Sequence, residues 1–176
     1  LIAGFVAVLL CVVALGMIYP AAGWGISRIT PKSAEGNLVY QGECLVGSSQ
    51  IQDGVDDGPY FFTRAEGMSN YGTSSTELER AIRERREEIA QREGVSVEQV
   101  PADAVTGSGS GVDSGISPEY AELQAPRVAR EQGMSVDDVK KLITDNTEHA
   151  SLGFLGEDTV NVTTLNIALP TPTPCP

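Results

Sequence analysis

The sequence opens on an apolar run, Leu1-Ile-Ala-Gly-Phe-Val-Ala-Val-Leu-Leu-Cys-Val-Val-Ala-Leu-Gly-Met-Ile18, and no charged residue occurs before Arg28. About 20 apolar residues in a helix, at roughly 1.5 Å rise each, span a hydrocarbon core of about 30 Å. Tyr19 and Trp24 follow where an aromatic belt forms at a membrane interface. The run therefore predicts a transmembrane helix over residues 1–26.

A cleaved signal peptide is the alternative interpretation of this run. The apolar region of a signal peptide usually spans about 7–15 residues and ends in a small-x-small cleavage site. The run in this chain is longer, and the candidate site near Pro20-Ala21-Ala22 matches that pattern poorly. The length therefore favours a helix that stays in the membrane.

Small residues recur at every fourth position of the run, at Ala3, Ala7 and Cys11. Such spacing leaves a groove in which a second transmembrane helix can approach closely. A lone helix facing lipid tolerates small residues equally well. We interpret Ala3, Ala7 and Cys11 as a candidate face for helix packing.

All charged residues lie beyond the apolar run, with 24 Asp and Glu against 12 Lys and Arg, for a formal net charge of −12. Residue 1 is Leu rather than Met, so we expect the natural chain to begin earlier. An acidic domain behind an N-terminal anchor fits a cytoplasmic N-terminus and an extracytoplasmic domain over 27–169. The acidity argues against a nucleic-acid partner, which needs a basic patch. Adaptation to salt or solubility also explains it.

Mixed strand and helix patterns in the soluble part predict a single α+β domain. Strands are expected at 37–41, around Ile51, at 60–62 and over 159–169. Helices are expected from Thr76, as N-cap, to Gly94, from Ser117 to about Arg130 with a kink at Pro126, and from Ser135 onward. Residues 170–176 are a Pro/Thr-rich tail that we expect not to pack.

A dense run of small residues, Thr106-Gly-Ser-Gly-Ser-Gly-Val-Asp-Ser-Gly-Ile-Ser-Pro118, precedes the second helix of the domain. Backbone N–H groups of such a loop can converge on an anion beside a helix N-terminus. The Lys that a P-loop requires is missing between Gln99 and Glu119. A tight surface or interface loop is therefore the alternative to an anion-binding loop.

Gln124, Arg127 and Arg130 are spaced three apart on the helix that follows, so we expect them to share one face. That face could hold an anion or a partner's carboxylate, or it could be solvated. The chain contains 1 His and 3 Cys, and their spacing predicts neither a metal site nor a catalytic arrangement. Cys44 and Cys175 could pair in an oxidising exterior.

The run Val105–Pro118 resembles the KdpC family, whose members carry Val-Thr-x-Ser-x-Ser-Gly-Leu-Asp-x-x-Ile-Ser-Pro. The likeness continues through Gln124-Ala-Pro-Arg-Val-Ala129 and through Gly156–Leu169, which is similar to the family's Val-Asn-Val/Ile-x-x-Leu-Asn-x-Ala-Leu. The family's Tyr-Phe-x-Gly-Arg-Pro-Ser-Ala is replaced by Tyr60-Phe-Phe-Thr-Arg-Ala-Glu-Gly67, and its Ser-Gly-Gly-Ser-Asn by Tyr71-Gly-Thr-Ser-Ser75. No role is carried over for that part.

The resemblance implies a non-catalytic accessory subunit of the potassium-transporting Kdp ATPase in the plasma membrane. Its partners would be a channel-like potassium-binding subunit and a P-type subunit that hydrolyses ATP. The family is described as a catalytic chaperone that raises the ATP affinity of the P-type subunit, so ATP would act through the complex and no covalent cofactor is implied. The resemblance makes the following residues candidates for a partner-contact or nucleotide-linked site: Ser108, Ser110, Asp113, Gln124 and Arg127.

The expected side of the membrane makes an indirect role the better interpretation. ATP is cytoplasmic, whereas the charge pattern places residues 28–176 outside. We therefore expect the helix to pack on the channel-like subunit and the domain to cap its potassium entrance, where its charge could enrich cations. A stand-alone signal-anchored binding or sensor domain is the alternative function.

Overall fold

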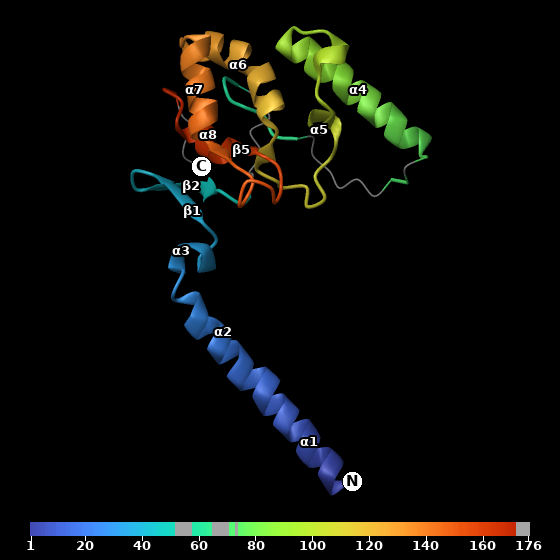
Figure 1. The fold of residues 1–176 in the computed structure, drawn as a ribbon, viewed down its shortest axis with the longest axis vertical. Coiled ribbons are helices and arrows are strands. Elements are labelled where there is room, and N and C mark those ends of the chain that lie inside the picture. The colour runs from blue at the N-terminus through green and yellow to red at the C-terminus, as the bar shows by residue number, and fades with distance from the viewer. Residues whose placement is uncertain (52–57, 65–70, 73, 172–176) are drawn as a thin grey trace. The chain divides into compact units, whose positions relative to one another are not determined.

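The computed structural model describes residues 1–51, 58–64, 71–72 and 74–171. The chain divides into two compact units, Leu1–Leu38 and Val39–Pro176 (Figure 1). An N-terminal helix makes up most of the first unit, and the second combines helices with short strands. The predicted α+β class and N-terminal apolar helix are both confirmed.

The N-terminal helix is continuous over Ile2–Ser27 and consists of α1 (Ile2–Val13), a π-helical turn η1 (Ala14–Ile18) and α2 (Tyr19–Ser27). By length and composition it can cross a membrane. The π-helical turn ends just before Pro20, which has no N–H to donate to the carbonyl of Gly16, so the regular hydrogen-bond ladder is interrupted there. A short helix α3 (Pro31–Ala34) follows.

The second unit contains two small sheets. The first pairs β1 (Leu38–Gln41) with β2 (Cys44–Ser48). The second has the strand order β3-β5-β4, with both pairs antiparallel. Its strands are β3 (Gly115–Ile116), β4 (Thr147–Glu148) and β5 (Thr159–Asn161). Val160 lies opposite Ile116 on one side and Thr147 on the other, so β5 is the central strand.

The helices of this unit are α4 (Thr76–Glu93), the 3₁₀ turn η2 (Val97–Gln99), α5 (Ala102–Val105), α6 (Pro118–Gln132), α7 (Val136–Asp145) and α8 (Val162–Ile167). The Oγ of Ser117 accepts the N–H of Tyr120, which fixes the start of α6, and Gly133 in the left-handed region ends it. The helix continues through Pro126, which is exposed. The predicted N-cap of α4 is wrong by one residue, because Ser75 rather than Thr76 accepts the N–H of Leu78.

The segment 159–169 corrects a predicted strand. Only Thr159–Asn161 is β, and α8 begins at Val162. The side chain of Asn161 accepts the N–H of Thr164 at 3.2 Å, which caps the helix and turns the chain. From Val162 onward the buried apolar residues are Val162, Leu165 and Leu169. Their spacing of three and four is typical of one face of a helix rather than of a strand.

Two other predicted strands are also corrected. Ile51 forms only an isolated bridge with Ser48. Residues 60–62 pair with no strand, although 61–62 are buried. Of the cysteines, Cys11 is free and Cys44 is disulfide-bonded, whereas Cys175, its predicted partner, lies outside the described residues.

The core of the second unit is built around α6. This helix contributes Tyr120, Ala121, Ala125, Val128 and Ala129, each at most 2% exposed. The small alanine side chains let neighbouring elements approach closely, and α7 packs along α6 (Figure 1). The core continues onto α4, α7, β5 and α8. Residues of α6 that do not face this core are therefore free to form polar contacts at its edge.

The close approach of Gly115 to Thr159 predicts that a methyl group added at Gly115 destabilises the fold. A Cβ at Gly115 would lie 2.6 Å from Cγ2 of Thr159, whereas a Cβ at Gly109 would meet nothing within 4 Å. We expect Gly115→Ala to lower the free energy of unfolding by about 1–3 kcal/mol through overpacking, and Gly109→Ala to change it little. Denaturant unfolding measures both. Adding Thr159→Ser should restore stability to Gly115→Ala, and equal stabilities of the two alanine variants would contradict this account.

Candidate functional site

A buried, extended segment at Phe61 and Phe62 lies between α6 and α8. Gln124 of α6 donates from Nε2 to the carbonyl of Phe62 at 3.0 Å and accepts its N–H at 2.8 Å. Asn166 of α8 forms the same pair of bonds with Phe61, at 3.0 and 2.8 Å. Gln124 is 0% exposed and Asn166 2%. Two side-chain amides therefore bind both polar groups of each of these residues.

The arrangement follows from the shape of an extended chain. A primary amide carries a donor and an acceptor side by side, as a peptide group does. The two amides come from different helices, so they take the place of the neighbouring strands that 61–62 lack. An unpaired buried backbone group costs about 1–3 kcal/mol. Gln124 and Asn166 thus avoid this energetic cost for a buried segment that has no strand partners.

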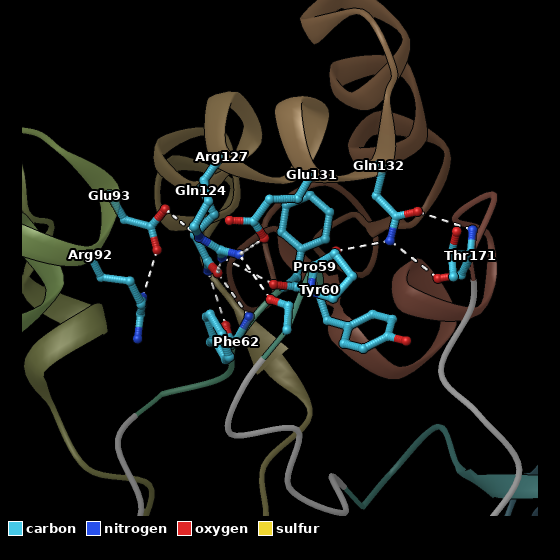
Figure 2. A network of polar contacts seen from close by, with 12 residues as sticks. Pro59, Tyr60, Phe62, Arg92, Glu93, Gln124, Arg127, Glu131, Gln132 and Thr171 are labelled. Atoms are coloured by element: carbon cyan, nitrogen blue, oxygen red, sulfur yellow. Dashed lines mark hydrogen bonds and ion pairs between the residues drawn. The ribbon is translucent and has the colours of Figure 1, made fainter.

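Arg127 extends this contact into a buried ion pair (Figure 2). Its Nε donates to Oε2 of Glu93 at 2.9 Å, and the side chains of Arg127 and Glu93 are 5% and 0% exposed. Its Nη2 donates to the carbonyl of Tyr60 at 3.0 Å and to Oε1 of Gln124 at 3.2 Å. Several hydrogen bonds around one guanidinium offset the desolvation of the charge. Arg127 therefore ties α6 to the end of α4.

A second guanidinium meets the same carboxylate and the same ring. Arg92 donates from Nε to Oε1 of Glu93 at 2.7 Å and from Nη2 to the hydroxyl of Tyr120 at 2.9 Å. The guanidinium carbons of Arg92 and Arg127 lie 4.3 and 4.6 Å from the centroid of Phe62. Both are cation–π distances. Burial raises the pKa of Tyr120, whereas Arg92 acts in the opposite direction.

The Gly/Ser loop turns its polar groups onto itself. Oγ of Ser108 accepts the N–H groups of Ser110 at 3.3 Å and Gly111 at 3.1 Å. Oγ of Ser110 accepts the N–H of Val112 at 3.3 Å. These three donors, which the anion-binding interpretation would direct at a ligand, are taken by the loop's own hydroxyls. Ser108 is buried at 3% exposure and Ser110 is exposed.

Asp113 closes the loop and faces a pocket. Its Oδ1 accepts the N–H of Gly115 at 2.9 Å, and its Oδ2 forms an ion pair with Arg64. A pocket of about 180 Å³ adjoins this pair, and its lining includes Asp103 and Glu157. Within the described part of the chain, no group of three or more His, Cys, Asp or Glu is arranged to hold a metal ion.

A second pocket, of about 250 Å³, lies beside the ion pairs of Arg92. Arg85, Glu88 and Arg92 of α4 line it together with Tyr120 of α6. Its charged groups are of both signs. The pocket therefore adjoins the ion-pair network without forming a cavity of one charge.

The five predicted site residues thus lie in two places. Ser108, Ser110 and Asp113 share the loop before α6, whereas Gln124 and Arg127 share the buried network at Phe62. Arg130, expected on the same face as Arg127, is exposed. Sequence reasoning missed further members of the network, including Phe62, Arg92, Glu93 and Asn166. The only sequence signal for Glu93 was its place next to the helix-ending Gly94.

The predicted packing face of the N-terminal apolar helix is exposed. Ala3, Ala7 and Cys11 follow one another at intervals of four on α1, so they lie along one side of the helix. No residue of α1 is buried within the chain. The packing role of this face stays a prediction.

Gln124 and Gln132, both on α6, allow the buried network to be tested against a matched control. We expect Gln124→Met, which keeps the volume and removes both bonds to Phe62, to lower the free energy of unfolding by about 2–4 kcal/mol. Gln132 also bonds to the backbone, at Pro59 and Thr171, yet in partly or fully exposed surroundings. Gln132→Met should therefore cost about 1 kcal/mol or less. Urea unfolding compares the two variants, and a similar loss in both would refute the strand-substitute role of Gln124.

Comparison with known proteins relates the whole chain to one family. The family model described as "KdpC: K+-transporting ATPase, c chain" matches residues 1–171. A protein of Kineococcus radiotolerans named potassium-transporting ATPase KdpC subunit is 38% identical, over 94% of this chain and 90% of its own. Proteins of the same name from Janthinobacterium sp. and Mycobacterium bovis are 40% and 38% identical. Both alignments cover 88% of this chain and 88% of the relative.

The match includes both the apolar helix and the α+β unit, so it does not rest on a shared membrane segment alone. It also extends over the Gly/Ser loop, α6 and α8, where the two clusters of site residues lie. The chain belongs to the KdpC family, the c chain of the K⁺-transporting ATPase.

Proposed function

We propose that this chain is a non-catalytic accessory subunit that assembles with the channel-like and ATP-hydrolysing subunits of a potassium uptake complex. Its N-terminus lies in the cytoplasm, one helix crosses the plasma membrane, and the α+β domain lies outside. The observation that carries this proposal is the separation of charge. The helix Ile2–Ser27 contains no charged side chain, whereas the rest of the chain carries the net charge of −12.

The geometry of the candidate residues supports an indirect effect on ATP. Three N–H groups of the Gly/Ser loop are bound by Ser108 and Ser110, and Gln124 and Arg127 are buried against Phe62. A nucleotide would have to break these contacts to bind there. The chain therefore raises the ATP affinity of the P-type subunit through contacts with its partners, and no cofactor of its own is required.

The exposed part of the loop is the region we assign to partner contact. Ser110 is exposed, and Asp113 is only partly buried at the rim of its pocket. Ser108 holds this surface in shape from beneath, because its Oγ accepts the N–H groups of Ser110 and Gly111. In the membrane, the side of α1 that carries Ala3, Ala7 and Cys11 packs against a helix of another subunit.

The single histidine is paired with a carboxylate at the surface. His149 is largely exposed, and its Nδ1 lies 2.8 Å from Oδ2 of Asp158. A hydrolytic triad would need a serine or cysteine on the other ring nitrogen. Within the described part of the chain, Asp158 is the hydrogen-bond partner of His149, so the ring is not arranged as in such a triad.

Topology and assembly can be tested together in the full complex. Glu122 is exposed on α6. We expect Glu122→Cys to react with a membrane-impermeant maleimide in intact cells, and the tagged chain to bring a P-type ATPase with it after mild solubilisation. A cytoplasmic protein with a surface cysteine is the control for permeation. Labelling only after lysis would overturn the orientation, and purification of the chain alone would favour the stand-alone sensor.

The acidic surface of the domain leads to a second prediction, about potassium affinity. Glu84, Glu87 and Glu122 are exposed, as are Lys140 and Lys141. Changing the three glutamates to Gln should raise the potassium concentration for half-maximal transport by about twofold at low ionic strength, because fewer cations gather near the domain. Lys140→Gln with Lys141→Gln should act in the opposite direction. Both effects should vanish near physiological salt, where the screening length is about 8 Å; unchanged potassium affinity in all variants would exclude cation enrichment.

A further inference from the structure

Among the described residues beyond the N-terminal helix, three large apolar side chains are exposed close together at the tip of one loop. Between β4 and β5 the chain forms a small hairpin over residues 150–155, which we call the apolar hairpin. Leu152 is 82% exposed, Phe154 73% and Leu155 53%. Single exposed apolar residues are common on protein surfaces, but three large ones within four positions are not explained by chance exposure.

Backbone hydrogen bonds give the apolar hairpin a defined shape. Ser151 and Leu155 exchange N–H···O bonds, both at 2.9 Å, and the N–H of Gly153 binds the carbonyl of Ala150 at 2.9 Å. The base is held by Asp158, whose Oδ1 accepts the N–H of Ala150 at 2.9 Å. The side chains at the tip are therefore presented by an ordered support, which lowers the entropy lost when they bind.

The backbone at the tip is strained at a residue that is not glycine. Leu152 has a φ of +57° and Gly153 one of +77°. The left-handed region suits glycine, whereas a leucine there is strained. A glycine at 152 would make the same turn more easily. The chain instead has a large, mostly exposed apolar side chain at a position whose backbone conformation disfavours any side chain.

The charges around the apolar hairpin distinguish a protein partner from a lipid surface. Glu148 and Glu157 are exposed on either side of it, and Asp158 lies at its base. Hydrogen bonds from the N–H of Ala150 and from His149 lower the pKa of Asp158. Anionic phospholipid headgroups repel such an acidic border and attract basic segments instead. A protein surface with basic residues around an apolar cleft matches both features.

We infer that the apolar hairpin inserts Leu152, Phe154 and Leu155 into an apolar cleft with a basic rim on another subunit of the potassium-transporting complex. This inference rests on the proposed function, because it requires assembly with other subunits. Phe154 is the central anchor, since aromatic side chains that fill a pocket contribute most to protein interfaces. The acidic residues beside the hairpin pair with the rim and orient the approach.

Photo-crosslinking in the assembled complex tests the contact directly. Benzoylphenylalanine would replace Phe154 in the full-length chain, expressed with the other subunits in membranes. We expect a covalent adduct with one other subunit. The same probe at Val136, which is 38% exposed at the start of α7, is the control and should give little or none. An adduct with lipid alone, or none in an assembled complex, would overturn the inference.

A pair of variants separates binding from folding. Leu152→Gly removes an apolar contact and relieves the left-handed backbone, so the thermal midpoint of the chain should stay the same or rise. Combined with Phe154→Ser, it should lower recovery of the other subunits at least fivefold in a stringent wash, while Val136→Ser leaves recovery unchanged. Full recovery of the double variant would refute the docking role. If the wild-type chain itself recovers no other subunit, the proposed function fails instead.

Discussion

The folded domain depends on how the backbone of Phe61 and Phe62 is satisfied in the interior. Neither residue has a neighbouring strand among the described residues, yet Phe61 is 0% exposed. Gln124 and Asn166 supply the missing partners from two helices. Because the amides come from α6 and α8, one short segment holds both helices. Arg127 and Arg92 then meet at the ring of Phe62 and share Glu93, so α4 is bound to the same point. A buried polar network of this kind fixes which elements meet, whereas apolar packing alone is less selective.

Local sequence signals predicted the helix boundaries that they control. They failed where contacts between residues far apart in the sequence determine the secondary structure. The helices at 76–93 and 118–132 were predictable because Gly94, Gly133 and the serine caps act within a few residues. The segment 159–169 was predicted as a strand because its β-branched residues suit one. Its helix depends on the cap at Asn161 and on burying Leu165 beside Asn166, whose partner Phe61 is 105 positions away. No pattern within the segment carries that information.

The candidate site shows the same division. Gln124 and Arg127 were singled out from the sequence, but their expected partners were an anion or another subunit. Their actual partners include Phe62 and Glu93, which lie 62 and 34 positions away. The Gly/Ser loop is similar, since its composition suits both an anion-binding turn and a loop capped by its own hydroxyls. The side-chain rotation of Ser108 decides between them, and composition does not specify it. The uncharged run at the N-terminus needs no tertiary information, which is why an apolar helix could be predicted there.

A domain on the outer side of the membrane, as proposed for this chain, can influence ATP binding only through the states of its partners. A bound subunit shifts an equilibrium by the difference between its affinities for the two states, so tight binding alone has no effect. A rigid domain is suited to this role, because it cannot adapt equally well to both arrangements of a partner surface. Linkage then sets a condition on the proposed mechanism: if the chain raises the ATP affinity of the P-type subunit, ATP must strengthen the attachment of the chain by the same factor. The ordered hairpin and the buried network at Phe62 are the features that would make such discrimination between two partner states physically feasible.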